Sequence, residues 1–229
     1  LGNDTDASAV LSVAAIANRF EAQVFVLRST VSPRVISDIR KALGPVPLVV
    51  MPEFLREGHA VVDALRPSRV VVGADTREWR AWGAGFLPGV AVVHTMLPEE
   101  ASLVKLASNT MLSVRAWFAR AVGDVCERLP GGDARTVLAA VYADRRIGQP
   151  GTPGLGAGGP CLPKDTAAFG ALTERAQRLV KELREDHREA PMYFCQRVER
   201  AVYAEGRDRI GPVAPSFSGR TVRIHGVGF

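Results

Sequence analysis

The sequence predicts an α/β segment built on a partial, mainly parallel sheet, followed by an all-α segment with long helices. Short apolar runs alternate with amphipathic stretches over the first third of the chain, which is typical of alternating strands and helices. From Pro98 onward the pattern changes to long runs with helical spacing. The 229 residues, 47% of them hydrophobic, suffice for one large domain or two small ones.

The first elements are predicted between residues 8 and 43. Residues 8–20 have helical spacing, and residues 24–30 form a β-branched run that ends in hydroxyl side chains. Residues 32–43 predict a helix with Ser32 as its N-cap and Pro33 at its first position, where a missing N–H is tolerated.

Three further apolar runs predict the rest of the sheet. They lie at 46–51, 69–75 and 90–95, with a helix expected at 76–86 between the last two. Their nearly continuous apolar composition is typical of strands that are buried on both faces. We therefore expect helices on both sides of the sheet.

The chain is predicted to be helical from Pro98 to about residue 205. Pro98 followed by Glu99 and Glu100 is a favourable helix start, because acidic side chains complement the helix dipole. The expected order is a helix at 98–129, a break at 130–133, a helix at 134–143, a glycine–proline loop at about 148–163, and a helical region from Asp165 with a break near Pro191.

These patterns predict three domains. The α/β domain covers 1–97, the helical domain covers 98–211, and residues 212–229 form a linker and the first strand of a further α/β domain. Because the chain opens on Leu1 and stops just after that strand, we expect a fragment that is cut at both ends.

Charge and hydropathy exclude several classes of protein. The net charge is +5, but acids and bases alternate in 178–189, as on a solvated helix face. The basic residues form no stripe with interleaved aromatics, so we expect no nucleic-acid partner. The chain has no run of about 18 apolar residues and no signal segment, so we expect no membrane partner.

The three cysteines predict a reducing compartment, and we expect a cytoplasmic protein. An odd, sparse count argues against a disulfide framework, and the spacing of Cys126, Cys161 and Cys195 is far from any zinc pattern, so no metal is expected. Cys126 and Cys195 lie in runs with helical periodicity, where the expected role is a small buried hydrophobe.

Polar side chains follow two of the predicted strands. Thr30 ends the run 24–30, and Glu53 comes after 46–51. In open parallel sheets, ligands bind beyond the carboxyl ends of the strands. The alternative is that both residues only cap turns.

Lys105 and Asn109 are four residues apart and share one face of the long helix. Together they offer a cation and an amide to an oxygen atom. The alternative is an edge of the buried face from which the lysine extends to solvent.

The stretch 154–165 contains the candidate nucleophile. Its glycines satisfy G-x-G-x-x-G, but no strand precedes them and prolines follow, so a dinucleotide fingerprint is rejected. Cys161 precedes a predicted helix start, where Lys164 and the helix dipole favour the thiolate. Asp165 can cap that helix or act as a base. A reactive thiol and a buried structural thiol both remain open.

Four motifs in order resemble the UDP-glucose/GDP-mannose dehydrogenase family, which oxidises the C6 alcohol of a nucleotide sugar to a carboxylate. They are RSTVSP (28–33), MPEFLREGHAVVDALRPSRVVVG (51–73), EEASLVKLASN (99–109) and GAGGPCLPKDT (156–166). The resemblance implies that 1–97 is the second half of a Rossmann-like NAD-binding domain. It also implies that 98–211 is a central domain that forms a homodimer through its helices, and that 212–229 begins a nucleotide-sugar-binding domain.

The resemblance also implies roles for individual residues. Cys161 is the nucleophile of a thiohemiacetal and a thioester, Lys105 and Asn109 stabilise charge on oxygen, and Asp165 and Glu53 handle protons and water. The implied contacts to the nucleotide sugar come from Glu53, Phe54, Leu55, Arg56, Glu57, Lys105, Asn109, Gly154, Gly158 and Arg146, and those to NAD from Thr30, Glu57 and Lys164.

The sequence departs from the family pattern at several positions. Ala157 replaces a usual aromatic, Met51 a usual asparagine, His59 a small hydroxyl residue and Ser68 a usual aspartate. We expect UDP-glucose as substrate, with GDP-mannose or a non-catalytic dimerisation remnant as alternatives. Because the true dinucleotide fingerprint is missing, we expect this fragment alone to bind NAD weakly and to have negligible turnover.

Overall fold

The computed structural model describes residues 7–86, 92–148, 159 and 161–204. They fall into two units, the first within Leu1–Met111 and Lys164–Arg178, the second within Leu112–Pro163 and Leu179–Phe229. The predicted strand at 221–229 and most of the glycine loop, with Gly154 and Gly158, lie outside the described residues. The division into three domains stays a prediction.

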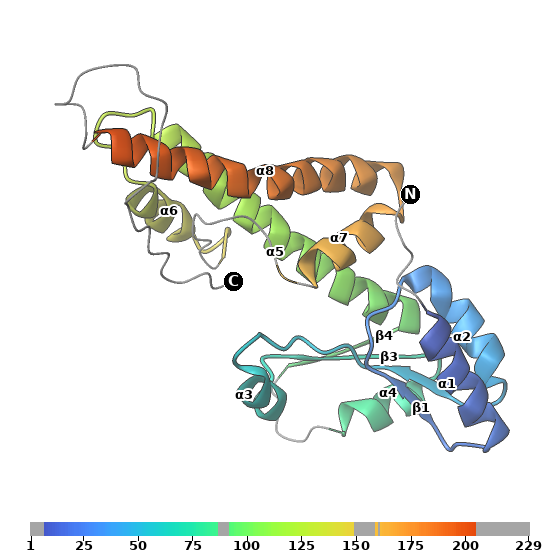
Figure 1. The fold of residues 1–229 in the computed structure, drawn as a ribbon. Coiled ribbons are helices and arrows are strands. Elements are labelled where there is room, and N and C mark those ends of the chain that lie inside the picture. The colour runs from blue at the N-terminus through green and yellow to red at the C-terminus, as the bar shows by residue number, and fades with distance from the viewer. Residues whose placement is uncertain (1–6, 87–91, 149–158, 160, 205–229) are drawn as a thin grey trace. The chain divides into compact units, whose positions relative to one another are not determined.

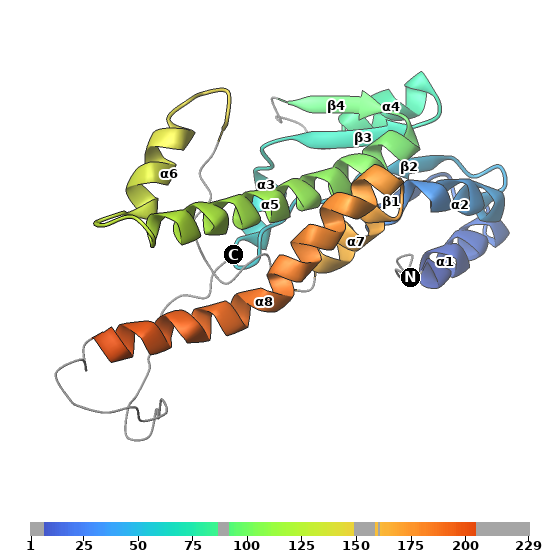
Figure 2. The same ribbon diagram turned by 90° about the horizontal axis from the view of Figure 1, so that it is seen from above.

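A four-stranded sheet forms the centre of the first unit, in the order β1-β2-β3-β4 (Figure 2). The strands are β1 Phe25–Leu27, β2 Leu48–Val50, β3 Val70–Ala74 and β4 Val93–Met96. β1 is parallel to β2 and β3 is parallel to β4, which confirms the mainly parallel sheet. Each strand lies within or close to its predicted run.

β3 runs antiparallel to β2, with Val50 opposite Gly73. The chain between these strands contains the short helix α3, Ala60–Leu65, which buries no residue. A parallel connection needs a crossover element that packs on the sheet, and α3 is not one. The apolar run at 69–75 predicted a strand but held no information on its direction.

Helices cover both faces of the sheet, as the buried strands predicted. Alternate residues of a strand point to opposite faces. Val50 and Val71 face a cluster with buried residues of α2 and with Ala14 of α1, while Val49 and Val72 face a cluster that includes Trp79 of α4. Figure 1 shows α1 and α2 side by side; the bounds are α1 Ser8–Arg19, α2 Ile36–Leu43 and α4 Arg77–Ala84.

Side-chain caps fix where several helices begin. The Ser32 hydroxyl accepts from the Arg34 N–H at a 3-10 turn, Pro33–Val35, that leads into α2. The long helix α5, Pro98–Cys126, begins where predicted, and the Glu100 carboxylate accepts from the Leu97 N–H at 2.8 Å. This contact satisfies a backbone donor that the helix leaves without an internal partner.

The remaining helices are α6 Ala134–Tyr142, α7 Leu162–Gly170 and α8 Glu174–Ala204. The predicted break at Pro191 is wrong, because α8 continues through this residue. The interruption lies at 171–173 instead, where the Thr173 hydroxyl accepts from the Ala176 N–H and starts a new helix. A proline in a helix removes one backbone hydrogen bond, and α8 tolerates that loss.

Contacts inside the second unit join α5 to α6 and α8. Arg120 of α5 forms a nearly buried ion pair with Asp186 of α8 at 3.0 Å. Burial raises the pKa of Asp186 above its usual range, although Arg120 opposes the rise. Arg115 lies over the Tyr142 ring at 5.7 Å. These contacts hold the three helices of this unit together.

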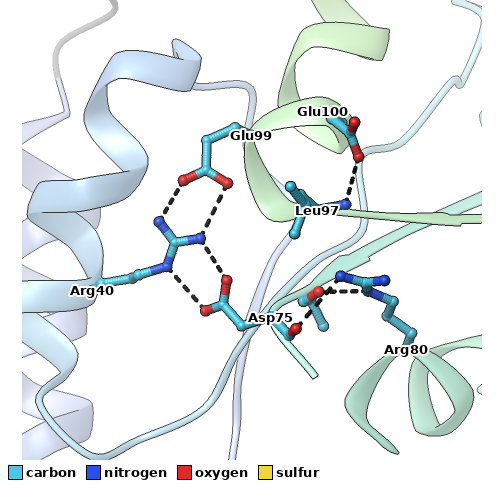
Figure 3. A network of polar contacts seen from close by, with 7 residues as sticks. Arg40, Asp75, Arg80, Leu97, Glu99 and Glu100 are labelled. Atoms are coloured by element: carbon cyan, nitrogen blue, oxygen red, sulfur yellow. Dashed lines mark hydrogen bonds and ion pairs between the residues drawn. The ribbon is translucent and has the colours of Figure 1, made fainter. Parts of the chain in front are cut away.

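In the first unit, the Arg40 guanidinium joins three elements (Figure 3). It donates to both oxygens of Asp75, which follows β3, and to both oxygens of Glu99 in the first turn of α5. Paired N–H···O bonds of this kind are short and directional. Arg40 of α2 therefore ties the start of α5 to the end of β3.

Gly73 lets α5 approach β3 closely. A Cβ at this position would lie 2.6 Å from the Ala101 Cβ and 2.8 Å from the Leu97 carbonyl oxygen. Both neighbours are rigid, because one is a helical alanine and the other is backbone. Only a glycine fits between β3 and the first turns of α5.

We predict that Gly73→Ala lowers the free energy of unfolding by about 1–3 kcal/mol, the usual cost of overpacking a core. Urea unfolding of the 229-residue chain measures this loss. Gly85→Ala is the matched control, because a Cβ there meets its nearest atom at 3.5 Å, an ordinary contact. Equal stabilities of the two variants would contradict the close approach.

Candidate active site

Lys105 of α5 and Glu53, which follows β2, form the first polar pair of the site. The Lys105 ammonium donates to the Glu53 carbonyl oxygen at 2.7 Å and to its Oε1 at 3.1 Å. Lys105 is only 6% exposed. Its charged end is therefore turned towards the loop after β2, and the alternative of a lysine that extends to solvent is wrong.

The Glu53 carboxylate is held ionised by its surroundings. Partial burial by itself would raise its pKa, but the Leu55 N–H, Lys105 and the charge of Arg28 together lower it below the usual value. The Leu55 N–H donates to Glu53 Oε2 at 2.7 Å. Glu53 thus caps a turn, as one alternative expected, and pairs with Lys105 as well.

Asn109 and Asp165 form the second pair. The Asn109 side-chain amide donates to Asp165 Oδ2 at 2.6 Å, and the Lys164 ammonium donates to Oδ1. Asp165 is 1% exposed, which makes it one of the most deeply buried polar residues described. A buried carboxylate requires such partners on both oxygens. Helix α5 therefore brings two carboxylates next to its own lysine and amide.

The loop 53–56 is anchored by residues that the sequence analysis did not select. Asp63 accepts from the Arg56 N–H and binds its guanidinium at 2.7–2.9 Å. This contact lowers the pKa of Asp63 to about 2. Arg69 lies over the Phe54 ring, and its guanidinium donates to the Ser108 hydroxyl. No spacing rule predicts these contacts, because they join separate elements.

An open pocket of ≈ 460 Å³ lies beside this loop in the first unit. Its lining includes Glu53, Phe54, Arg56, Arg66 and Arg69. A volume of this size suits a small-molecule ligand, and the arginines favour an anionic one.

The other predicted site residues have different surroundings. Thr30 follows β1 at the same edge of the sheet as Glu53, and Leu55, Arg56 and Glu57 are exposed. Arg146 belongs to the second unit and is largely exposed, with an ion pair to its neighbour Asp144. The structure therefore brings Glu53, Lys105, Asn109, Asp165 and Lys164 together in the first unit.

The cysteines differ in exposure. Cys161 directly precedes α7 and is exposed, so the alternative of a buried structural thiol is wrong. Cys126 is buried, as expected. The expectation of a buried Cys195 is wrong, because this residue lies on an exposed face of α8. Helical periodicity predicted the helix but not which face it buries.

Sequence comparison assigns the chain to a family. Residues 3–84 match the NAD binding domain of the UDP-glucose/GDP-mannose dehydrogenase family, and residues 99–188 match its central domain. The chain belongs to this family. The resemblance drawn from the four motifs is thereby confirmed.

Curated relatives include UDP-glucose 6-dehydrogenases from bacteria and archaea. One from Rickettsia conorii is 34% identical over 186 residues, which cover 76% of this chain and 43% of the relative. AglM from Haloferax volcanii is 37% identical over 180 residues, covering 71% and 41%. The aligned part of the chain thus spans less than half the length of these relatives.

Solved structures have the same fold. A UDP-glucose dehydrogenase from Pyrobaculum islandicum superposes with a TM-score of 0.76 at 33% identity, over 86% of this chain and 49% of that one. A UDP-D-ManNAc dehydrogenase from Pyrococcus horikoshii gives 0.73 at 18% identity, over 88% and 50%, and supports the fold alone. The Rossmann-like character of the sheet is therefore confirmed.

The Thr30 hydroxyl lies at the edge formed by the carboxyl ends of β1 and β2, where ligands of open parallel sheets bind, and has no hydrogen-bond partner among the described residues. Within the same ranges, no three His, Cys, Asp or Glu side chains gather into a metal site. None of the described helices is long and apolar enough to cross a bilayer.

We predict that Glu53→Gln destabilises the chain at pH 7 and has a smaller effect at acidic pH. The folded pKa of Glu53 is lowered, so its contribution is complete above the ordinary value of 4.5 and is lost as the pH falls through the folded pKa. Urea unfolding of both proteins from pH 7 to pH 3 measures this. A constant difference over that range would contradict the ion pair with Lys105.

Proposed function

We propose that the natural protein carrying this sequence oxidises the C6 hydroxyl of a nucleotide sugar with NAD, converting UDP-glucose to UDP-glucuronate. The observation that supports it most is the pair of contacts on α5, Lys105 with Glu53 and Asn109 with Asp165. They supply donors for an oxygen that gains charge and carboxylates that take up protons. The names of the relatives support the choice of sugar.

The first oxidation removes a proton from the C6 hydroxyl and a hydride from C6. NAD, when bound, supplies the acceptor for one hydride in each of the two oxidations. Glu53 and Asp165 provide the carboxylates that receive protons, directly or through water. Lys105 and Asn109 donate hydrogen bonds to the substrate oxygen and stabilise its charge. The product of this step is an aldehyde.

Cys161 carries the covalent part of the proposed reaction. Its thiolate adds to the aldehyde carbon, and the oxygen takes up a proton to give a thiohemiacetal. Loss of a second hydride and of that proton gives a thioester. Water then attacks the thioester carbon, the C–S bond breaks, and the sulfur leaves as the thiolate. A thiol suits this role because the thioester is hydrolysed readily and the nucleophile is regenerated.

The remaining assignments follow the family resemblance. In this proposal the backbone of 53–57, with Gly154, Gly158 and Arg146, binds the nucleotide sugar, and Thr30, Glu57 and Lys164 contact NAD. In this arrangement Asp63 binds both the Arg56 guanidinium and the Arg56 N–H, so the contribution of Arg56 to sugar binding requires release of these contacts.

Cys161→Ser is expected to abolish formation of the acid, because a hydroxyl in its place is a far weaker nucleophile. NADH formation at 340 nm and mass spectrometry of the sugar product measure the outcome in the natural protein. Cys195→Ser is the matched control, because it changes another exposed cysteine and should leave the rate unchanged. Full conversion to the acid by Cys161→Ser, with two NADH per sugar, would contradict the covalent mechanism.

We further propose that the protein is a homodimer through its central helices. Phe118 and Val125 of α5 are both exposed and lie seven residues apart, so they share one helix face. Leu129 and Val137 are exposed apolar residues of the same unit. Exposed apolar side chains that share a helix face are typical of a contact surface.

Replacement of Phe118 and Val125 together by glutamate is expected to convert the dimer into a monomer, because two charges would have to be buried in the contact. Light scattering coupled to size-exclusion chromatography gives the mass. Val61→Glu on α3 places one charge at another exposed valine and should leave the dimer intact. A monomeric wild type would overturn the proposal.

A further inference from the structure

Phe54 lies between two cationic side chains in the first unit. The Arg69 guanidinium carbon is 4.1 Å from the centre of the Phe54 ring, and the Lys105 ammonium is 5.5 Å from it. Arg69 also donates to the Ser108 hydroxyl at 3.3 Å. A planar guanidinium over an aromatic face is attracted to the ring and restricts its position.

We propose that Arg69 is a positioning residue for the loop 53–56 and acts on the nucleotide sugar through the Phe54 ring. The part that concerns the sugar rests on the proposed function. Arg69 makes its contact from the start of β3, which runs antiparallel to β2 and so brings residue 69 beside residue 54. Ser108 holds the same guanidinium from α5. The Arg69 side chain thus links β3, helix α5 and the loop 53–56.

The contacts of the loop explain why Phe54 is its effective anchor. The Leu55 N–H donates to Glu53 and the Arg56 N–H donates to Asp63, and both acceptors lie within ten residues in the same stretch of chain. Among the described residues of 53–56, Phe54 alone packs against the core cluster of α1 and α2. Movement of this ring would therefore move the whole loop relative to α5.

The position of Glu53 depends directly on this anchor. Its carbonyl oxygen accepts from Lys105 at 2.7 Å, and Phe54 is the next residue. Lys105 has its own contact with the Phe54 ring, so ring and lysine support one another. Loss of the Arg69 stack is expected to loosen the loop backbone while Lys105 and Asn109 stay on their helix.

The first experiment needs no enzymatic activity. In the 229-residue chain, Arg69→Gln is expected to speed hydrogen exchange at the Leu55 and Arg56 amides about tenfold, the scale of one desolvated cation–π contact. The amides of β2 should be unaffected. Arg77→Gln, which removes an exposed arginine from α4, is the matched control. Unchanged exchange at Leu55 and Arg56 would overturn the proposal.

The second experiment measures steady-state kinetics of the natural protein with UDP-glucose. Arg69→Gln is expected to raise KM about tenfold and to lower kcat by a smaller factor, because the loosened loop binds the sugar and also carries Glu53, while Lys105 and Asn109 stay on α5. Arg69→Lys should restore part of the loss, and Ser108→Ala should cause a smaller rise.

A cycle with Phe54→Leu tests whether Arg69 acts through the ring. The double variant should have no higher KM than the worse single variant, since both changes remove one contact. Additive effects, or a fall in kcat with KM unchanged, would overturn the positioning role. A wild-type protein that forms no NADH with UDP-glucose would refute the proposed function and the sugar-binding part of this proposal. The exchange experiment would still decide whether Arg69 positions the loop.

Discussion

The close contact between α5 and β3 at Gly73 sets the position of every α5 side chain that reaches the site. Ala101 occupies the space beside Gly73, and Arg40 fixes the turn before it through Glu99. Once Ala101 is in place, the helical repeat brings Lys105 and Asn109 to the same face, one and two turns further on. The placement of Lys105 and Asn109 therefore depends on Gly73, which has no Cβ and so lets α5 pack closely against β3.

Burial decides how the charged groups of the site behave. Lys105 and Asp165 are almost completely removed from water, and each is held by partners of opposite charge or by donors. An unpaired charge at either position would be costly, so the pairs stabilise the folded chain. In a proposed reaction that moves protons and stabilises an oxygen, the same pairs supply the acceptors and donors, already oriented.

In the proposed function, the loop after β2 connects this arrangement to the substrate. Its backbone is organised by Glu53, by Asp63 and by the Phe54 ring, which come from one continuous segment of chain. Arg69 and Lys105 contact it from outside that segment, and Ser108 holds the Arg69 guanidinium. A loop held in this way binds a ligand with little loss of conformational freedom, which is how a rigid site gains affinity. Family membership and these contacts support the same chemistry from independent evidence.

The sequence alone determined where the four strands and most of the helices lie, because apolar periodicity, Ser32, Pro98 and the two acids after Pro98 act within a few residues, but it misplaced the break in the last helical region and did not predict α3. It also placed Lys105 and Asn109 on one helix face, and its motifs identified the family. Only the tertiary structure decided that β3 runs antiparallel to β2, that Lys105 turns inward, and that Arg69 meets Phe54 and Ser108. The Arg69–Ser108 contact joins residues 39 apart, and those of Glu53 with Lys105 and of Asn109 with Asp165 join residues 52 and 56 apart. Strand register and helix packing set such contacts, and local patterns in a sequence do not encode either one.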